Sequence, residues 1–142
     1  MNCSNIYFSN SVEETLALGE KLAQRLKVGD VVALNGDLGA GKTCFAQGIA
    51  RGLGVKDYVT SPTFTIMNVL EGRLKMYHFD VFRIDNPDEM EEIGFREYVF
   101  GDGICVIEWS DLISKYMPDR VFDVRIFFCG QNARRIELGV PE

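Results

Sequence analysis

The chain has 142 residues, of which 46% are hydrophobic and 25% are charged, and we expect one domain over residues 1–142. Lys and Arg total 15 against 21 Asp and Glu, which gives a formal net charge of -6. This balance argues against a chain that grips a nucleic-acid backbone unaided, so any RNA would be held by a partner protein. No apolar run approaches the ~20 residues of a membrane helix, and the N-terminal residues show no signal-peptide pattern. We therefore expect a cytoplasmic protein without membrane contact.

The cysteines and the histidine argue against a zinc-type centre. The four cysteines, Cys3, Cys44, Cys105 and Cys129, include no CxxC pair and do not show the spacing of metal ligands. The single His78 cannot build a histidine-rich site. We expect reduced cysteines with structural roles.

The first predicted elements are a strand and a helix. Residues 6–8 are Ile-Tyr-Phe, which is typical of a short strand. Ser11 then begins a helix, because Glu14 three residues later completes a capping box. The helix should bury one stripe of leucines, formed by Leu18, Leu22 and Leu26.

A glycine-rich loop over residues 36–43 lies between a predicted strand and a predicted helix. Its sequence is Gly-Asp-Leu-Gly-Ala-Gly-Lys-Thr, and it follows the apolar run Val-Val-Ala-Leu-Asn at 31–35. The next helix is indicated by apolar residues at four-residue spacing, Phe45, Ile49 and Leu53. Glycines allow backbone N–H groups to converge on phosphate oxygens, and the helix directs its positive end at the same place. The pattern predicts a phosphate-binding loop for a nucleotide.

Two side chains of this loop have specific predicted roles. Lys42 would contact the β- and γ-phosphates, and the Thr43 hydroxyl would hold Mg²⁺. The expected nucleotide contacts within the loop are Asp37, Leu38, Gly39, Ala40, Gly41, Lys42 and Thr43.

The middle of the chain alternates polar turns with strands. Thr-Ser-Pro-Thr at 60–63 is a proline-stiffened loop that can sense a γ-phosphate, although a Ser-Pro turn usually has a structural role alone. Glu-Gly at 71–72 predicts a hairpin turn into a strand at 75–83. Asn-Pro-Asp at 86–88 predicts the start of a short helix.

Two kinds of strand predict the architecture. Continuous apolar runs at 31–34 and 104–107 suit a sheet that is covered on both faces. Residues 121–129 and 134–140 alternate apolar with polar side chains, which predicts an antiparallel hairpin at an edge with one covered face. We therefore predict an α/β fold of the P-loop NTPase kind, a three-layer sandwich with a mixed, partly parallel sheet and a C-terminal antiparallel edge hairpin.

Glu108 follows the apolar strand 104–107 directly. In parallel α/β sheets, ligands gather at the carboxyl ends of the strands. This position favours Glu108 as a Mg²⁺ ligand, direct or through water, over a solvated glutamate at a strand end. Trp109 should emerge at the same edge and contact nucleotide or a partner, although a lone tryptophan more often packs into a core.

Asp80 is the second carboxylate of interest. It lies in an apolar strand with His78, and alternation places both side chains on one face. An unpaired buried carboxylate is costly. Asp80 therefore either pairs with Arg83 or His78, or positions an attacking water near Mg²⁺, and the pattern does not choose between these roles.

In these motifs the chain resembles the TsaE family, also called YjeE, of ATPases in tRNA threonylcarbamoyladenosine biosynthesis. The resemblance spans nearly the whole chain. Four motifs in the same order carry it: Gly-Asp-Leu-Gly-Ala-Gly-Lys-Thr at 36–43, Ser-Pro-Thr-Phe at 61–64, His-Phe-Asp at 78–80 and Val-Ile-Glu-Trp at 106–109.

The resemblance implies a protein that binds ATP and Mg²⁺ and associates with the TsaB and TsaD proteins. That pair modifies adenosine 37 of tRNAs reading codons that begin with A, and ATP hydrolysis by the small subunit is stimulated by the partners and supports repeated turnover. Carried over by position, the resemblance makes Lys42 a phosphate contact and Thr43 and Glu108 the Mg²⁺ ligands. It also makes Asp80 a helper of metal or water, which gives Lys42, Asp80 and Glu108 as the catalytic set. Residues 61–64 correspond to a switch-like loop, and Ser11 lies by the adenine.

The chain departs from the family pattern at two places. Phe82 stands where the family usually has Tyr, and residues 69–70 lack a frequent aromatic. Both departures concern partner contact and local packing rather than phosphate or metal binding. Two other functions compete: a small-molecule kinase, for which residues 87–100 offer no lid-sized insertion, and a scaffold that needs ATP binding but not hydrolysis.

Overall fold

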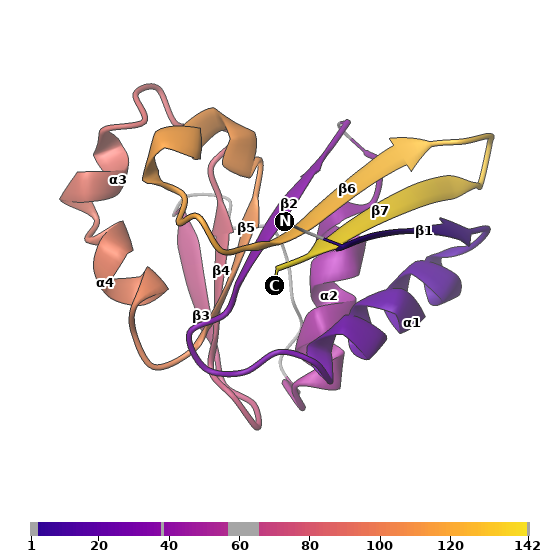
Figure 1. Ribbon diagram of the computed structural model, residues 1–142, viewed down its shortest axis with the longest axis horizontal. Helices are drawn as coiled ribbons and strands as arrows, with labels where there is room; N and C mark the ends of the chain where they lie inside the picture. Colours follow the sequence, from indigo (N-terminus) through magenta and orange to yellow (C-terminus); the bar gives the residue numbers. More distant parts are fainter. Residues whose placement is uncertain (1–2, 38, 57–65, 142) are drawn as a thin grey trace.

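A computed structural model describes residues 3–37, 39–56 and 66–141. Within those residues, one sheet has the strand order β1-β7-β6-β2-β5-β4-β3 (Figure 1). The strands are β1 (Cys3–Ser9), β2 (Val31–Gly36), β3 (Met67–Leu70), β4 (Met76–Asp80), β5 (Ile104–Glu108), β6 (Phe122–Phe128) and β7 (Arg134–Val140). The helices are α1 (Val12–Ala23), α2 (Lys42–Gly52), α3 (Glu89–Glu92), α4 (Phe95–Val99) and the 3-10 helix η1 (Ser110–Tyr116).

The sheet is mixed, as predicted. β2 runs parallel to both of its neighbours, β5 and β6, and β4 runs parallel to β5. The pairs β1–β7, β6–β7 and β3–β4 are antiparallel. β2, the strand that precedes the glycine loop, therefore has a parallel neighbour on each side. The carboxyl ends of these parallel strands lie at one edge of the sheet, next to the loop.

Helices cover the sheet from both sides, which confirms the three layers. α1 and α2 lie against one face, and α3, α4 and η1 against the other (Figure 1). Alternation along β5 divides its side chains between two cores: Ile104 and Val106 join the α1–α2 side, whereas Cys105 and Ile107 join the other. A strand buried on both faces reads as a continuous apolar run, which is why residues 104–107 show no polar position.

The C-terminal hairpin is antiparallel, as predicted, but it does not form the edge of the sheet. β1 pairs with β7 from Cys3 opposite Val140 to Ser9 opposite Arg134, and β1 is the outermost strand. Alternation in β6 and β7 predicts which face is covered and carries no information on lateral position. The edge therefore falls to the strand at residues 3–9.

The α1 helix begins as its capping box predicts. The Ser11 hydroxyl accepts the Glu14 N–H at 3.1 Å. The Glu14 carboxylate reaches back to the N–H of Asn10, at 3.3 and 3.4 Å from its two oxygens, one residue before the position expected for a capping box. The start of α1 is thus tied to the end of β1.

α1 and α2 cross at a seam of glycines. A Cβ atom on Gly48 would lie 2.4 Å from the carbonyl oxygen of Leu16, and one on Gly19 would lie 2.5 Å from that of Phe45. The missing side chains let the two backbones touch. This contact sets the position of α2, whose first residue is Lys42.

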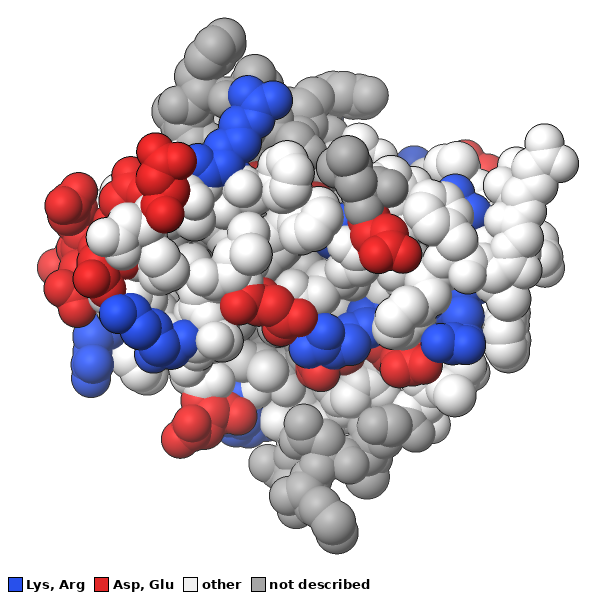
Figure 2. All heavy atoms as spheres, turned by 90° about the horizontal axis from the view of Figure 1, so that it is seen from above, with Lys and Arg blue, Asp and Glu red and all other residues white. Residues whose placement is uncertain are grey.

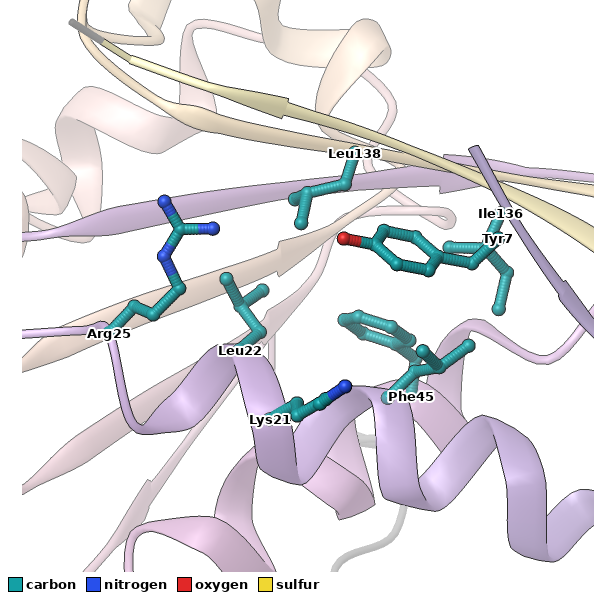
Figure 3. A pocket seen from close by; sticks show the side chains of 8 residues that line it. Tyr7, Lys21, Leu22, Arg25, Phe45, Ile136 and Leu138 are labelled. Atoms are coloured by element: carbon teal, nitrogen blue, oxygen red, sulfur yellow. The ribbon is translucent and has the colours of Figure 1, made fainter. Parts of the chain in front are cut away.

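A cavity of about 180 Å³ is lined by residues of α1, α2, β1 and β7. Figure 3 shows Tyr7 from β1 on one side of it, Phe45 from α2 beneath, and Lys21 and Arg25 of α1 along its rim. Both cationic residues are exposed to solvent. Within the described ranges, no helix combines the length and the apolar character needed to cross a membrane.

Candidate functional site

The glycine loop connects the end of β2 to the start of α2, as predicted. Gly39 (φ 80°) and Gly41 (φ 111°) adopt left-handed backbone, which strains any other residue. Gly36 is needed for a different reason, because a Cβ there would lie 2.5 Å from the carbonyl oxygen of Ile126 on β6. Among the described residues, no side chain caps α2, and its first N–H groups and the positive end of its dipole face the loop. Leu38 lies outside the described residues.

The Lys42 ammonium is held inside the loop. Its Nζ donates to the carbonyl oxygens of Gly36 at 2.7 Å and Asp37 at 2.8 Å. It also lies over the Trp109 ring, 3.9 Å from the centroid. Burial lowers the pKa of Lys42, and the nearby carboxylates, that of Glu108 first, oppose this shift. The site therefore places a buried cation where phosphate oxygens would replace backbone carbonyls as its partners.

Glu108 is buried between α2 and β4. The Thr43 hydroxyl donates to its two oxygens, at 3.0 and 3.2 Å. His78 Nε2 lies 2.6 Å from Glu108 Oε2, and both side chains are almost fully shielded from solvent. Two elements distant in sequence thus fix one carboxylate.

The donor set fits Mg²⁺. The Thr43 hydroxyl and the Glu108 carboxylate supply hard oxygen ligands, and Mg²⁺ takes one or two protein carboxylates with the rest of its shell from phosphate and water. The described residues contain no cluster of three or more His, Cys, Asp or Glu that could hold a metal without such help. This arrangement suits an ion that arrives with a nucleotide.

Asp80 lies beside Glu108, because the register of β4 and β5 pairs these two residues. Its carboxylate accepts the N–H of Phe82 at 3.0 Å. Burial raises the pKa of Asp80, with the Phe82 hydrogen bond opposing and the Glu108 charge adding to the increase. Within the described part of the chain, Asp80 forms neither of the two ion pairs considered for it. His78 contacts Glu108 instead of Asp80, and Arg83 makes no salt bridge to Asp80. A role toward water or metal stays a prediction.

Trp109 occupies a left-handed turn directly after β5. Its φ is 65°, and its backbone N–H donates to the carbonyl oxygen of Leu34 at 2.9 Å. The centroid of its ring lies 4.6 Å from that of the Phe82 ring. Asn35 fixes the next residues, donating to the Ser110 hydroxyl at 2.8 Å and accepting the Asp111 N–H at 3.0 Å. The turn therefore holds the indole over the loop lysine. Asn35 was not among the predicted site residues, although a polar residue ending an apolar strand is a usable signal.

Apart from residues 37–41 of the glycine loop, the predicted residues fall into three groups. Lys42, Thr43, Asp80, Glu108 and Trp109 come together at the carboxyl ends of β2, β4 and β5. Ser11 instead caps α1, whose first turn adjoins that of α2 through a contact of 3.7 Å between Cys44 Sγ and the Val12 carbonyl oxygen. The loop at residues 61–64 lies outside the described residues.

Comparison with known proteins finds one family and one similar solved structure over most of the chain. The family described as "Threonylcarbamoyl adenosine biosynthesis protein TsaE" matches residues 9–136. A tRNA threonylcarbamoyladenosine biosynthesis protein TsaE from Bacillus subtilis is 45% identical over 125 residues, covering 87% of this chain and 78% of the relative. Its counterpart from Treponema pallidum is 40% identical over 130 residues, covering 92% of this chain and 96% of the relative. The crystal structure of Bacillus subtilis YdiB superposes with a TM-score of 0.87 and 36% identity, covering 100% of this chain and 88% of that one.

Proposed function

The chain belongs to the TsaE family of threonylcarbamoyl adenosine biosynthesis proteins, and from this premise we propose that it is a Mg²⁺-dependent ATPase that supports threonylcarbamoyladenosine modification of tRNA. The observation that carries the proposal is the geometry around Lys42 and Glu108. A glycine loop, a helix N-terminus, a buried ammonium and a hydroxyl–carboxylate pair converge on one point. Together they match the charge and ligand demands of a triphosphate with its metal.

Each side chain has a role that follows from its present contacts. Lys42 would exchange the carbonyl oxygens of Gly36 and Asp37 for phosphate oxygens. Thr43 and Glu108 would hold Mg²⁺, which when bound offsets the negative charge of the phosphates. Trp109 keeps the ammonium in the loop through its ring.

Asp80 is the proposed base or water-positioning residue. Among the residues that the structure describes, its carboxylate accepts one hydrogen bond, from the Phe82 N–H, and it faces the same side of the sheet as Glu108. Because burial raises its pKa, it holds a proton more readily than an ordinary aspartate. That property suits a group that orients, and briefly accepts a proton from, an attacking water.

We further propose that the protein acts in the cytoplasm with TsaB and TsaD and meets tRNA only through them. The net charge of -6 disfavours direct contact with a polyanion. On the face shown in Figure 2, acidic side chains gather toward the α3 end, and the basic ones are interspersed with acidic ones rather than joined into a stripe. A partner protein is the more favourable binding surface for RNA.

Calorimetric titration with ATP and Mg²⁺ tests nucleotide binding, and the single tryptophan offers a second readout. Because the Lys42 ammonium lies 3.9 Å from the Trp109 ring centroid, phosphate that draws the ammonium away should change the fluorescence. Wild-type protein is expected to respond and Lys42→Ala to lose the response. Folded wild-type protein that takes up no adenine nucleotide would refute the proposal.

A reconstituted modification assay with TsaB, TsaD and tRNA tests hydrolysis. Glu108→Gln keeps the side-chain volume and is expected to bind ATP, release phosphate at least about a hundredfold more slowly and fail beyond the first turnover. Glu108→Gln that supports many turnovers would favour a scaffold that needs ATP binding alone. Phosphate found on a metabolite rather than free in solution would favour a kinase.

A further inference from the structure

Arg134, at the start of β7, contacts the glycine loop from the far end of the chain. Its Nε donates to the carbonyl oxygen of Ala40 at 3.0 Å. β7 alternates, and Arg134 lies on the same face as Ile136 and Leu138, the face that packs on α1 and α2. The C-terminal hairpin thus delivers one cationic side chain to the phosphate loop.

The guanidinium is held in a fixed orientation. Its Nη1 donates to the Ala133 carbonyl oxygen at 3.0 Å, and its plane lies over the Phe128 ring at 4.4 Å from the centroid. Phe128 is the register partner of Arg134 across the hairpin, and a Cβ on Gly39 would lie 4.0 Å from the tip of its ring. A planar fork on an aromatic face is a geometry that lysine cannot copy.

Holding the Ala40 carbonyl has a consequence for the next N–H. In a planar trans peptide the C=O and the following N–H point in opposite directions. Arg134 draws the Ala40 oxygen toward the hairpin, so the Gly41 N–H is turned away from the hairpin. Gly41 immediately precedes Lys42, where N–H groups of a phosphate loop meet the nucleotide.

We propose that Arg134 is a positioning residue of the nucleotide site, which sets the orientation of the Ala40–Gly41 peptide and so pre-forms the phosphate cradle. The inference rests on the proposed nucleotide-binding function. It assigns to the C-terminal hairpin a role in binding that the loop sequence alone does not contain. Since the loop N–H groups meet phosphates that ADP and ATP share, Arg134 should affect both nucleotides alike.

The test compares Arg134→Gln and Arg134→Lys with Arg135→Gln. Arg135 is a matched control, because it neighbours Arg134 but faces the other side of the sheet, where it lies over the Phe127 ring and pairs with Glu137 at 3.2 Å. Both Arg134 variants are expected to weaken ADP and ATP binding about tenfold. They should raise KM and leave kcat at saturating ATP nearly unchanged, whereas Arg135→Gln should match wild type.

A spectroscopic signature separates positioning from loss of fold. In nucleotide-free protein, the Gly41 amide resonance should move in both Arg134 variants and stay in place in Arg135→Gln, with the thermal midpoints compared alongside. If Arg134→Lys binds nucleotide with wild-type affinity, Arg134 contributes only its charge. If the Arg134 variants lower kcat and leave KM unchanged, Arg134 acts on the transferred phosphate. Either result overturns the inference. Normal wild-type binding with an unaffected Arg134→Gln removes this role alone, whereas wild-type protein that binds no nucleotide removes the proposed function as well.

Discussion

Gly48→Ala should destabilise the protein although alanine is the better helix former. Gly48 lies in α2, and the added Cβ would meet the Leu16 carbonyl oxygen at 2.4 Å and the Gly19 Cα at 3.1 Å. The first of these distances is about 1.0 Å smaller than 3.4 Å, the distance at which ordinary van der Waals contact begins. Both neighbours are backbone atoms of α1, so relief requires the two helices to separate.

The opposing terms can be compared in magnitude. Replacing glycine within a helix stabilises by up to ~1 kcal/mol. Forcing a methyl group into a closely packed contact costs about 1–3 kcal/mol. If the helices move apart by about 0.5–1 Å elsewhere in the interface, each dispersion contact there also loses roughly a quarter to a half of its energy. We expect the free energy of unfolding to fall by about 2 kcal/mol net, with a drop of roughly 6 °C in the thermal midpoint.

Urea denaturation followed by circular dichroism measures this change. Gly19→Ala should reproduce it, because the Gly19 Cβ would meet the Phe45 carbonyl oxygen at 2.5 Å across the same seam. Ala17→Gly, on the exposed side of α1, serves as the control for helix propensity and should cost ~1 kcal/mol without any clash. Gly48→Ala protein as stable as wild type, or more so, would refute the reasoning. Since α2 begins at Lys42, weaker ATP binding should accompany the loss.

Two further predictions concern ionisable groups. The Tyr77 hydroxyl at 2.6 Å, and then Lys75 at 3.2 Å, lower the pKa of Asp102 from its ordinary value of 3.8. The stabilisation is therefore present above that ordinary value and lost as pH falls through the lower, folded one. Asp102→Asn should lower the thermal midpoint at pH 7 and converge with wild type at acidic pH; an equal deficit at both ends would contradict this. Burial raises the pKa of Cys105 to about 12, so a variant retaining only this cysteine should resist a disulfide reagent at pH 8 until urea unfolds it, whereas one retaining only the exposed Cys129 should react at once.

The positions of the glycine loop and of the carboxylate at the end of β5 were predictable from short-range pattern, whereas the role of Glu108 as a Mg²⁺ ligand stays a prediction. The strand at 31–36, the glycines and the helix at 42–52 are local in sequence, so residue type and spacing identify them. The place of Glu108 was predictable because an apolar strand ends at it, and the carboxyl ends of parallel strands share one edge of the sheet. Both inferences need only the chain near the residue concerned.

The partner of His78 depends on strand register, which alternation does not supply. Alternation placed His78 and Asp80 on one face, and the structure agrees with that. The imidazole nevertheless contacts Glu108, because the β4–β5 pairing sets His78 opposite Val106 and Asp80 opposite Glu108. Register across two strands is a property of the folded sheet and of its packing.

The contact of Arg134 with Ala40 has the same origin. These residues are 94 positions apart, and the pair Arg134-Arg135 reads in sequence only as two adjacent cations. Their division between opposite faces of β7 follows from strand geometry. That one of them reaches the phosphate loop follows from β6 lying beside β2, which no local pattern specifies.

The central place of β2 has a consequence for how the protein matures on the ribosome. Its two neighbours, β5 and β6, begin at Ile104 and Phe122, so a nascent chain displays the whole glycine loop long before the flanking strands exist. Parallel pairing over such separations is a late and slow event. A polypeptide that stops short of Phe122 would carry the glycine-loop motif in its sequence without β6, one of the two strands that flank β2 in the folded sheet.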